Sequence, residues 1–264
     1  MSINTNRVVT NRKLFDEGRV GEESFVRSSS DLEGPVSFAI DRSGLPLRFS
    51  GIRPQSVQRT VARSVRLVVK RSGDIGIAAL GLLTLSPLFA LVALAVVLES
   101  PGPVFFRQMR EGLNGRLFPT YKFRSMRAGE CDASGLNFTV ASDKRVTRLG
   151  AFLRRTSIDE LPQLANVLLG HMSMVGPRPH VPGMLAAGGV YRDFVPYYDD
   201  RLTMLPGITG WAQANGYRGD VSDPALAQMR IDHDIAYIQN FSLWLDLRII
   251  VTTLRREFIR GSGV

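Results

Sequence analysis

A long uncharged segment dominates the pattern of apolar and polar positions along the chain. Residues 75–98 form 24 consecutive positions without a charge. A helix of that length, at about 1.5 Å per residue, crosses a hydrocarbon layer of about 30 Å. Ser86 and Pro87 lie at its midpoint, where proline removes a helical hydrogen bond and clashes with the preceding turn. The pattern therefore predicts a membrane helix that breaks at Ser86-Pro87.

Basic residues flank this segment on both sides, five of them before it and six after it. Basic clusters beside a membrane helix prefer the cytoplasmic face. We therefore expect both ends on that face, as in a bent, re-entrant helix that enters and leaves by one leaflet. The alternative is a simple span with the N-terminal residues outside.

Two further stretches predict amphipathic helices. Residues 56–71 combine an apolar stripe with a basic face, formed by Val57, Val61, Val65 and Val68 and by Arg59, Arg63, Arg66 and Lys70. This helix packs on a protein core or lies on anionic lipid, and the membrane segment that follows it favours lipid. A C-terminal stripe keeps a 3.6-residue period, at Trp244, Leu247, Val251, Leu254 and Phe258. That stripe fits a core or a membrane surface equally well.

The rest of the chain predicts a mixed fold. Residues 104–106 and 118–123 have the character of short strands joined by a Gly-rich turn, and the pattern becomes helical from Thr147 to Leu169. Residues 1–55 carry scattered charge without a sustained apolar period and predict a mobile arm. We therefore expect an α+β, mainly helical fold: the arm at 1–55, membrane-associated helices at 56–101, and a cytoplasmic domain at 102–264 that carries the candidate chemistry.

The net charge of +9 is concentrated in one region. Residues 52–127 hold 12 Lys and Arg against 3 Asp and Glu, and the rest of the chain is balanced. Arg makes up 29 of the 33 basic residues, which suits bidentate recognition of phosphate. A nucleic-acid-binding protein would also be basic, but this stretch flanks the apolar segment and lacks stacking aromatics interleaved over a recognition helix. Nucleic acid is therefore not an expected partner.

Two adjacent carboxylates, Asp159 and Glu160, are the main candidates for chemistry. Such a pair can hold a divalent cation or divide the roles of nucleophile and acid or base. Two structural alternatives stay open. Ser157 and Glu160 have the spacing of a capping box, and Asp159 could itself begin a helix that has Pro162 in its first turn.

Four cations are candidates for binding a phosphorylated substrate. Arg178 lies between two prolines that restrict its backbone, which suits a fixed phosphate contact or simply a rigid loop. Arg154 lies shortly before the carboxylate pair. Lys122 and Arg124 share one face of an extended stretch, because side chains alternate along a strand.

Two other patterns carry less weight. In the Gly-rich segment 207–216, Trp211 could stack on a base and Gln213 is a further candidate for substrate binding, although a lone tryptophan is more often part of the core. Asp232 and Asp234 match the short D-x-D pattern of metal-dependent glycosyltransferases, but a tripeptide is too common to indicate a metal site by itself.

Taken together, five ordered motifs resemble those of the bacterial sugar transferase family, the monotopic polyprenyl-phosphate hexose-1-phosphate transferases. They are KFRSM (122–126), RVTRLGAFLRRTSIDELPQLANVLLG (145–170), MVGPRP (174–179), GITGWAQANG (207–216) and SLWLDLRII (242–250). The resemblance covers roughly residues 66–260. Larger members carry four transmembrane helices and a further domain before this core, where this chain has other sequence. His171 and Ala165 replace an acidic residue and a tryptophan that many members have at these positions.

The resemblance implies a membrane enzyme that starts exopolysaccharide or O-antigen synthesis. Its substrates would be a UDP-hexose and a polyprenyl (undecaprenyl) phosphate, with Mg²⁺ as cofactor, UMP as product and a covalent aspartyl-phosphosugar intermediate. In the family, the residue matching Asp159 is the nucleophile and the one matching Glu160 sits with it at the metal. Phosphates are held at the positions matching Lys122, Arg154 and Arg178.

The resemblance also sets the location and leaves one other class of function open. It implies the cytoplasmic face of the bacterial inner membrane, in contact with inner-membrane lipid, and its re-entrant helix breaks at a Ser-Pro that matches Ser86-Pro87. A homo-oligomer is left open. The alternative to an enzyme is a non-catalytic membrane scaffold for polysaccharide assembly, which predicts no release of UMP.

Overall fold

The computed structural model describes residues 38–40, 46–48, 61–129, 143–217 and 222–260. Within the predicted arm it describes two short antiparallel strands, β1 (Phe38–Ile40) and β2 (Pro46–Arg48). The rest of residues 1–55 lies outside the described residues, so the mobility of the arm stays a prediction. The first five residues of the predicted amphipathic helix, 56–60, also lie outside them.

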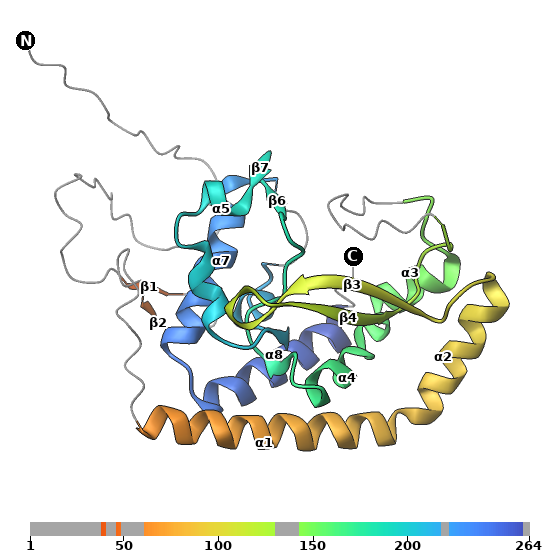
Figure 1. Ribbon diagram of the computed structural model, residues 1–264, viewed down its shortest axis with the longest axis horizontal. Helices are drawn as coiled ribbons and strands as arrows, with labels where there is room; N and C mark the ends of the chain where they lie inside the picture. Colours follow the sequence, from red (N-terminus) through yellow and green to blue (C-terminus); the bar gives the residue numbers. More distant parts are fainter. Residues whose placement is uncertain (1–37, 41–45, 49–60, 130–142, 218–221, 261–264) are drawn as a thin grey trace, which may run out of the picture. The chain divides into compact units, whose positions relative to one another are not determined.

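Two helices meet at the predicted break. Helix α1 (Val61–Thr84) and helix α2 (Ser86–Glu99) are bent by 60° relative to each other (Figure 1). Pro87 lies in the first turn of α2, where a missing N–H breaks no helical hydrogen bond. The Ser86 hydroxyl donates back to the Leu83 carbonyl at 2.8 Å. No single helix among the described residues has the length and hydropathy of a membrane span, but this bent pair reaches both when taken together.

Helix α1 unites the predicted amphipathic helix with the first half of the apolar segment. Three of its cations, Arg63, Lys70 and Arg71, are bound to the rest of the protein, whereas Arg66 is exposed. Lys70 donates from Nζ to Asp246 at 2.6 Å, and Arg71 donates from Nη2 to the Val167 carbonyl at 2.7 Å. Val65 and Val68 instead lie exposed, Val68 with 66% of its surface accessible. A helix that faces water shows the opposite arrangement. Lys70 and Arg71 are bound within the protein, so they are not the part of this helix that could meet anionic lipid.

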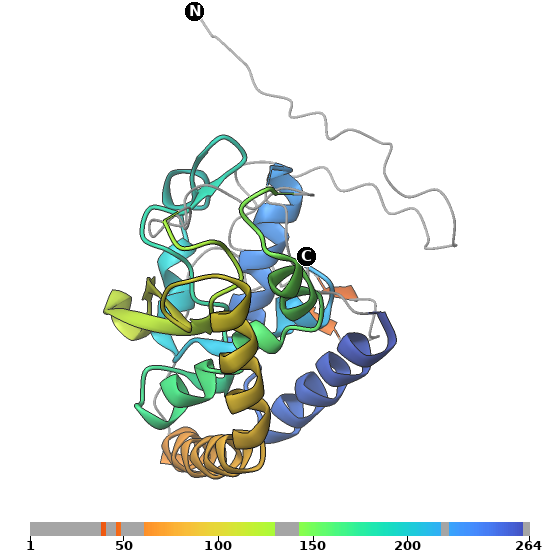
Figure 2. The ribbon, with the colours of Figure 1, turned by 90° about the vertical axis from the view of Figure 1, so that its right-hand side faces the viewer.

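A buried polar network fixes α1 to the C-terminal half of the chain. Besides Asp246 of α8 (Leu243–Arg260), Lys70 approaches Asp74 at 3.6 Å. Asp74 accepts a hydrogen bond from Ser173 of β5 (Ser173–Val175), and Asp246 accepts one from Tyr237 of α7 (Pro224–Gln239). Figure 2, which looks along α1, shows α8 passing obliquely beside it. Because buried charges are stable only when paired, this network sets the position of α1.

The predicted hairpin is confirmed. Strand β3 (Phe105–Glu111) pairs antiparallel with β4 (Leu117–Phe123) around a short 3₁₀ turn, η1 (Leu113–Gly115). Phe106 lies opposite Lys122, and Arg110 lies opposite Phe118. Since side chains alternate along a strand, this register places Arg110 and Lys122 on the same face of the hairpin.

The helical region expected at 147–169 is broken into three parts. They are α3 (Arg148–Arg155), the 3₁₀ turn η2 (Ile158–Glu160) and α4 (Gln163–Leu168). Ser157 lies at the break with φ of 55°, a left-handed conformation that a non-glycine residue adopts at a cost. The break gives Asp159 and Glu160 a turn of their own between the two helices.

The remaining elements connect the site to α8 and were not predicted. Strand β5 pairs in parallel with β8 (Gly207–Thr209), and a small hairpin forms from β6 (Leu185–Ala186) and β7 (Gly189–Val190). Short helices follow, α5 (Tyr191–Phe194), η3 (Tyr198–Thr203) and α6 (Trp211–Ala214). The described structure is therefore mixed, with helices predominating and short strands between them.

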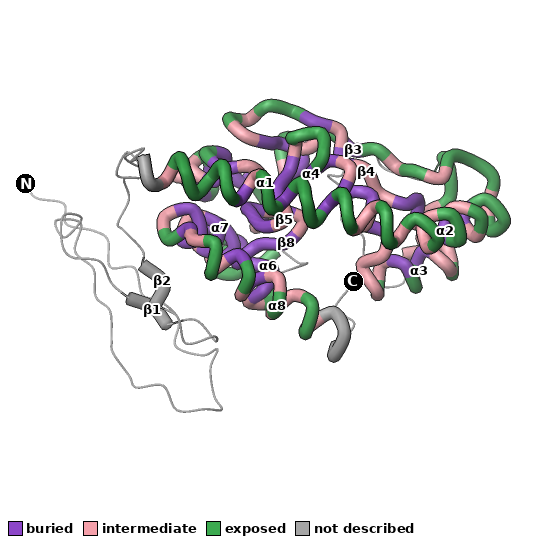
Figure 3. Tube along the Cα trace, turned by 90° about the horizontal axis from the view of Figure 1, so that it is seen from below, coloured by how far each residue is buried: buried purple, intermediate pink, exposed green. Residues whose placement is uncertain are grey.

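Apolar contacts join the bent helices to the rest of the molecule on one side only. Ala78 of α1 packs with Phe118 and Leu164, and Val92 and Val96 of α2 pack against Phe123 and Leu153. Viewed from below, exposed positions recur along α1 and α2 (Figure 3). The C-terminal stripe on α8 is exposed as well, at Trp244, Leu247, Val251 and Leu254. Of the two options for this stripe, the structure excludes the core.

Candidate functional site

The carboxylate pair lies where three segments meet. Asp159 and Glu160 of η2 are both buried, next to Lys122 of β4 and to Arg178 in the loop that follows β5. Lys122 comes from the predicted strand and Arg178 from the segment between two prolines. The structure thus brings together four of the predicted site residues from three separate motifs.

Neither helix-capping alternative explains the pair. Ser157 lies in the left-handed region and makes no side-chain cap hydrogen bond, and α4 begins only after Pro162. A capping residue normally has extended backbone and accepts a hydrogen bond from the first turn. Thr147 does this for α3, since its side chain accepts from Gly150 N at 2.9 Å. Neither Asp159 nor Glu160 therefore uses its carboxylate to cap a helix.

Glu160 is neutralised by two cations. Its Oε1 accepts a hydrogen bond of 2.7 Å from Lys122 Nζ and another of 2.7 Å from Arg178 Nη2. The second oxygen, Oε2, lies 3.4 Å from Arg178 Nη1. A buried carboxylate needs such partners, because removing it from water unpaired is costly.

Asp159 is in a different electrostatic state from its neighbour. The pKa of Asp159 is raised to about 6, mainly by burial; the negative charge of Glu160 acts in the same direction, and the positive charge of Lys122 acts against it. Both cations direct their hydrogen bonds to Glu160, and in the described part of the chain no such bond reaches the Asp159 carboxylate. Carboxylates in adjacent positions with different environments can take different chemical roles. Asp159 thus combines a raised pKa with a carboxylate that these cations leave without a hydrogen bond, whereas Glu160 is paired with both of them.

Arg110 adds a cation to the site that sequence reasoning missed. It lies on the same face of the hairpin as Lys122. Burial lowers the pKa of Arg110 to about 10, with the charge of Arg178 acting in the same direction and that of Glu160 in the opposite one. The signal was present in the sequence, because an antiparallel pairing of the two predicted strands in this register places both cations on one face.

Asn166 fixes the distance between the carboxylate turn and the hairpin. Its side-chain amide is fully buried, donates to the Pro119 carbonyl at 2.7 Å and accepts from Tyr121 N at 3.0 Å. The Asn166 side chain thus makes two hydrogen bonds to the backbone of β4 at the edge that does not pair with β3, as the backbone of a further strand would. This contact holds the strand that carries Lys122 next to the turn that carries Glu160, so that the two side chains lie within hydrogen-bonding distance.

Three predicted substrate-binding residues lie in structural roles. The guanidinium of Arg124 is buried and donates to carbonyls at the end of α2, at 2.6 Å to Ser100 and 2.6 Å to Pro101. Trp211 is only 5% exposed and belongs to the core, and Gln213 is buried beside it, with Nε2 3.3 Å from the Ile208 carbonyl. A ring that stacks on a base needs an open face, which Trp211 lacks. The geometry therefore argues against the predicted stacking.

The D-x-D pair has other partners. Asp232 accepts a hydrogen bond of 2.7 Å from the Tyr197 hydroxyl, and Asp234 pairs with Arg201 at 2.8 Å. Within the described residues no group of three or more His, Cys, Asp or Glu side chains is arranged to hold a metal ion. The pair at Asp159 and Glu160 thus supplies at most two protein ligands.

Comparison with known proteins agrees with this arrangement. A family model described as bacterial sugar transferase matches residues 65–260. The chain belongs to the bacterial sugar transferase family. The match begins in α1 and ends in α8, so it contains the bent helices and every residue of the site.

The chain is similar to named sugar transferases from several bacteria. The exopolysaccharide production protein PSS of Rhizobium leguminosarum bv. phaseoli is 53% identical over 75% of this chain and 98% of its own length. A UDP-glucose:undecaprenyl-phosphate glucose-1-phosphate transferase of Caulobacter vibrioides is 43% identical over 85% of this chain and 84% of its own length. An Escherichia coli K12 protein of the same description is 44% identical over 81% of this chain but only 45% of its own length. The chain thus spans less than half the length of some sugar transferases that it matches.

Proposed function

We propose that this sugar transferase moves a hexose 1-phosphate from a UDP-hexose to undecaprenyl phosphate, with a covalent phosphosugar on Asp159. The observation that carries the proposal is the buried Asp159 carboxylate, which is close to two cations but receives no hydrogen bond from them. The names of the similar proteins support undecaprenyl phosphate as acceptor and a UDP-sugar as donor.

The reaction has two steps. An oxygen of Asp159 attacks the sugar-bearing phosphorus of the donor, and the bond from that phosphorus to the bridging oxygen breaks, so UMP leaves with the electron pair. A phosphate oxygen of the acceptor then attacks the same phosphorus, and the bond to Asp159 breaks. Dividing the transfer in this way means that each step needs only one substrate in the site.

The cations make the first attack feasible. A diphosphate donor repels an anionic nucleophile, and fixed positive charges lower this repulsion and stabilise the charge that develops in the transition state. Lys122 and Arg178 are positioned for this by Glu160. Arg154 adds a positive charge that lowers the pKa of Asp159 more than that of Arg178 does, and we propose that it also contacts a phosphate.

Mg²⁺ fits the same site as the cofactor. Magnesium is commonly held by one or two carboxylates together with substrate phosphates, and Asp159 and Glu160 would be those carboxylates. When bound, the ion supplies positive charge at the donor phosphates. With only two protein ligands, Mg²⁺ should bind much more tightly in the presence of the donor than in its absence, which titration calorimetry with and without UDP-hexose measures.

We propose that the enzyme lies in the cytoplasmic leaflet of the bacterial inner membrane. The bent helices expose apolar side chains along their length, and the α8 stripe adds a second apolar surface. An acceptor that resides in lipid and a donor that is soluble require a site at the interface. A re-entrant course of α1 and α2 provides that position.

The decisive experiment is covalent labelling in the absence of acceptor. The full chain, in detergent with Mg²⁺ and UDP-hexose labelled in the sugar, should retain label on the protein and release UMP. Asp159→Asn should bind donor but stay unlabelled, and Glu160→Gln should reduce labelling. Asp232→Asn is the matched control, because it removes a carboxylate outside the site. An unlabelled wild type, or a labelled Asp159→Asn, would contradict the assignment, and absence of UMP release would favour the scaffold alternative.

A further inference from the structure

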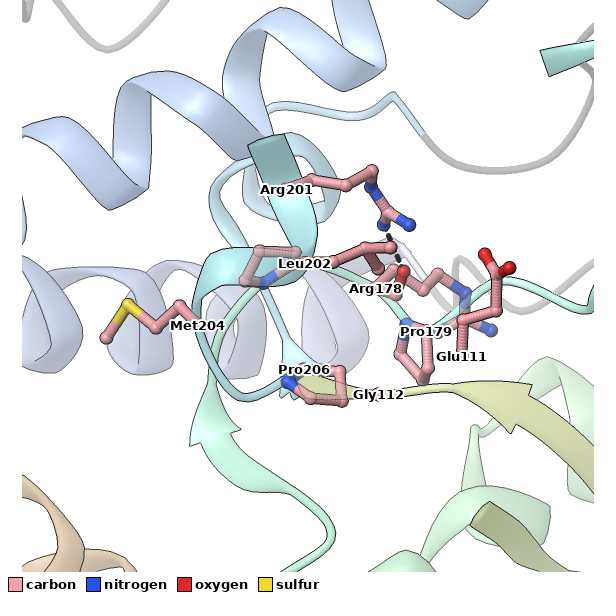
Figure 4. Close-up of a pocket in the computed structure, with 9 residues that line it drawn as sticks. Glu111, Gly112, Arg178, Pro179, Arg201, Leu202, Met204 and Pro206 are labelled. Carbon is pink, nitrogen blue, oxygen red and sulfur yellow. Dashed lines mark hydrogen bonds between the residues drawn. The ribbon is translucent and has the colours of Figure 1, made fainter. Parts of the chain in front are cut away.

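The backbone that carries Arg178 is held at three consecutive carbonyl groups. The Pro177 carbonyl accepts from Gly207 N at 2.9 Å, and the Pro179 carbonyl accepts from Arg110 Nη1 at 2.9 Å. Between them, the Arg178 carbonyl accepts from Arg201 Nη2 (Figure 4). Proline has no N–H group, so a segment with proline on both sides of Arg178 must be held through its carbonyls.

Arg201 reaches this carbonyl from a fully buried position. Only 1% of its surface is accessible, and it pairs with Asp234 through Nη2 at 2.8 Å and Nε at 3.1 Å. Burying a charge pair costs desolvation and is often no better for stability than apolar side chains of the same volume. Stability alone therefore does not explain why a guanidinium occupies this place. Besides its contact with Asp234, Nη2 of Arg201 donates to the backbone carbonyl of Arg178.

Arg110 approaches the Arg178 loop from a different element than Arg201 does. It comes from β3, whereas Arg201 comes from η3, and Figure 4 shows Arg178 and Pro179 between η3 and Gly112, the residue that follows β3. A second contact of Arg110, to the Gln108 side chain, fixes the plane of its guanidinium. Two arginines from separate elements thus donate hydrogen bonds to neighbouring carbonyls of one loop.

We propose that Arg110 and Arg201 are positioning residues that clamp the Arg178 backbone, so that its guanidinium stays on Glu160. The inference rests on the proposed function, because it assigns these arginines to the same site. Asp234 belongs to the clamp as the partner that keeps Arg201 charged and oriented. Displacement of a substrate-positioning group by about 1 Å can lower turnover by about 10²-fold, so a loosened loop should act through Arg178.

The first test measures the loop directly and needs no substrate. Arg201→Met combined with Asp234→Leu removes both charges and keeps the volume, so the fold should survive. Hydrogen–deuterium exchange of a peptide covering 174–181 should become about tenfold faster than in wild type, while peptides from α4 keep their rate. Asp199→Asn is the matched control, since Asp199 lies on the same 3₁₀ helix and its exposed ion pair is with Arg192 of α5. Unchanged exchange in the double variant would overturn the clamp.

The second test asks whether the clamp acts through Arg178. The double variant should lower kcat for UMP release by about 10²-fold with a smaller change in KM for the donor. In an Arg178→Lys background the same change should cause little further loss, because the guanidinium that the clamp positions is already missing. Fully additive losses would show that Arg201 serves only as packing.

Further variants keep the two proposals separable. If the double variant loses its cooperative melting transition, Arg201→Lys, which keeps a charge opposite Asp234, and Arg110→Met replace it in both measurements. If wild-type protein releases no UMP, the proposed function fails, and the exchange comparison still decides the clamp.

Discussion

The guanidinium of Arg178 faces the carboxylate of Glu160 with two nitrogens, Nη2 at 2.7 Å and Nη1 at 3.4 Å. Only a planar fork can make this pair of contacts while its backbone is confined by prolines on both sides. A single ammonium nitrogen could not make both contacts.

Replacing this guanidinium with an ammonium should impair turnover. We expect Arg178→Lys to lower kcat/KM for UMP release by about 10²-fold, because one point charge replaces a preorganised pair of donors. Arg155→Lys, at an exposed arginine on α3, is the matched control. Wild-type kinetics in Arg178→Lys would place this residue outside the site.

The rate should follow the ionisation of Asp159. Burial raises the pKa of this carboxyl to about 6, and only the deprotonated form is a nucleophile. The ratio kcat/KM should rise about tenfold per pH unit below the pKa of Asp159 and level off above it. Saturating Mg²⁺ should move this rise below pH 6, because the charge of the ion favours the ionised carboxylate. Because Lys122 lowers the pKa of Asp159, Lys122→Met should shift the rise to higher pH. An identical pH profile in Lys122→Met and wild type would contradict the assignment.

The same shift makes Asp159 costly for stability at neutral pH. The pKa of Asp159 is raised from 3.8 in the unfolded chain to about 6 in the folded protein, so folding favours the protonated form and stability falls as pH rises through this window. Asp159→Asn should therefore raise the free energy of unfolding at pH 7.5 by about 3 kcal/mol. The gain should disappear near pH 4. Thermal melting with a chelator present measures both.

Glu160→Gln provides the contrast. Since Glu160 neutralises Lys122 and Arg178, removing its charge leaves two half-buried cations without their ion-pair partner and should lower the melting temperature at pH 7.5. A loss of stability in Asp159→Asn equal to that in Glu160→Gln would mean that the two carboxylates share one role.

Trp244 reports whether α8 touches lipid. The chain has two tryptophans, of which Trp244 is 73% exposed on α8 and Trp211 is 5% exposed in the core. In vesicles that contain brominated phospholipids, Trp211→Phe should keep strong quenching of the remaining tryptophan fluorescence. Trp244→Phe should lose it. Equal quenching of the two variants would remove α8 from the membrane surface.

The strands and the helix break could be predicted because their signals are local. The turn at 111–115, the alternation around Lys122 and the proline at 87 each act within a few residues. The alternation of side chains in both predicted strands, combined with their antiparallel pairing, also implies that Arg110 lies on the same face as Lys122. Local signals thus located the cations and the break.

The contacts that complete the site are distant in sequence. Arg201 meets Asp234 across 33 residues, and Asn166 reaches Pro119 across 47. The parallel pairing of β5 with β8 is equally non-local. Tertiary contacts of this kind leave no periodic trace, so sequence reasoning took Asp234 for half of a weak metal motif. It likewise assigned Arg124 to substrate, because a buried arginine that caps a helix looks the same in sequence as one that binds phosphate.

The inward position of Lys70 imposes an order on biosynthesis. Its partner Asp246 lies 176 residues further along the chain, and at about 5–20 residues per second a ribosome needs roughly 10 to 30 s to reach it. During that interval Lys70 has only Asp74, one turn further along the same helix, as a carboxylate neighbour, and the face of α1 that packs on the protein is uncovered. The polar network around Lys70 can therefore close only after α8 has been synthesised.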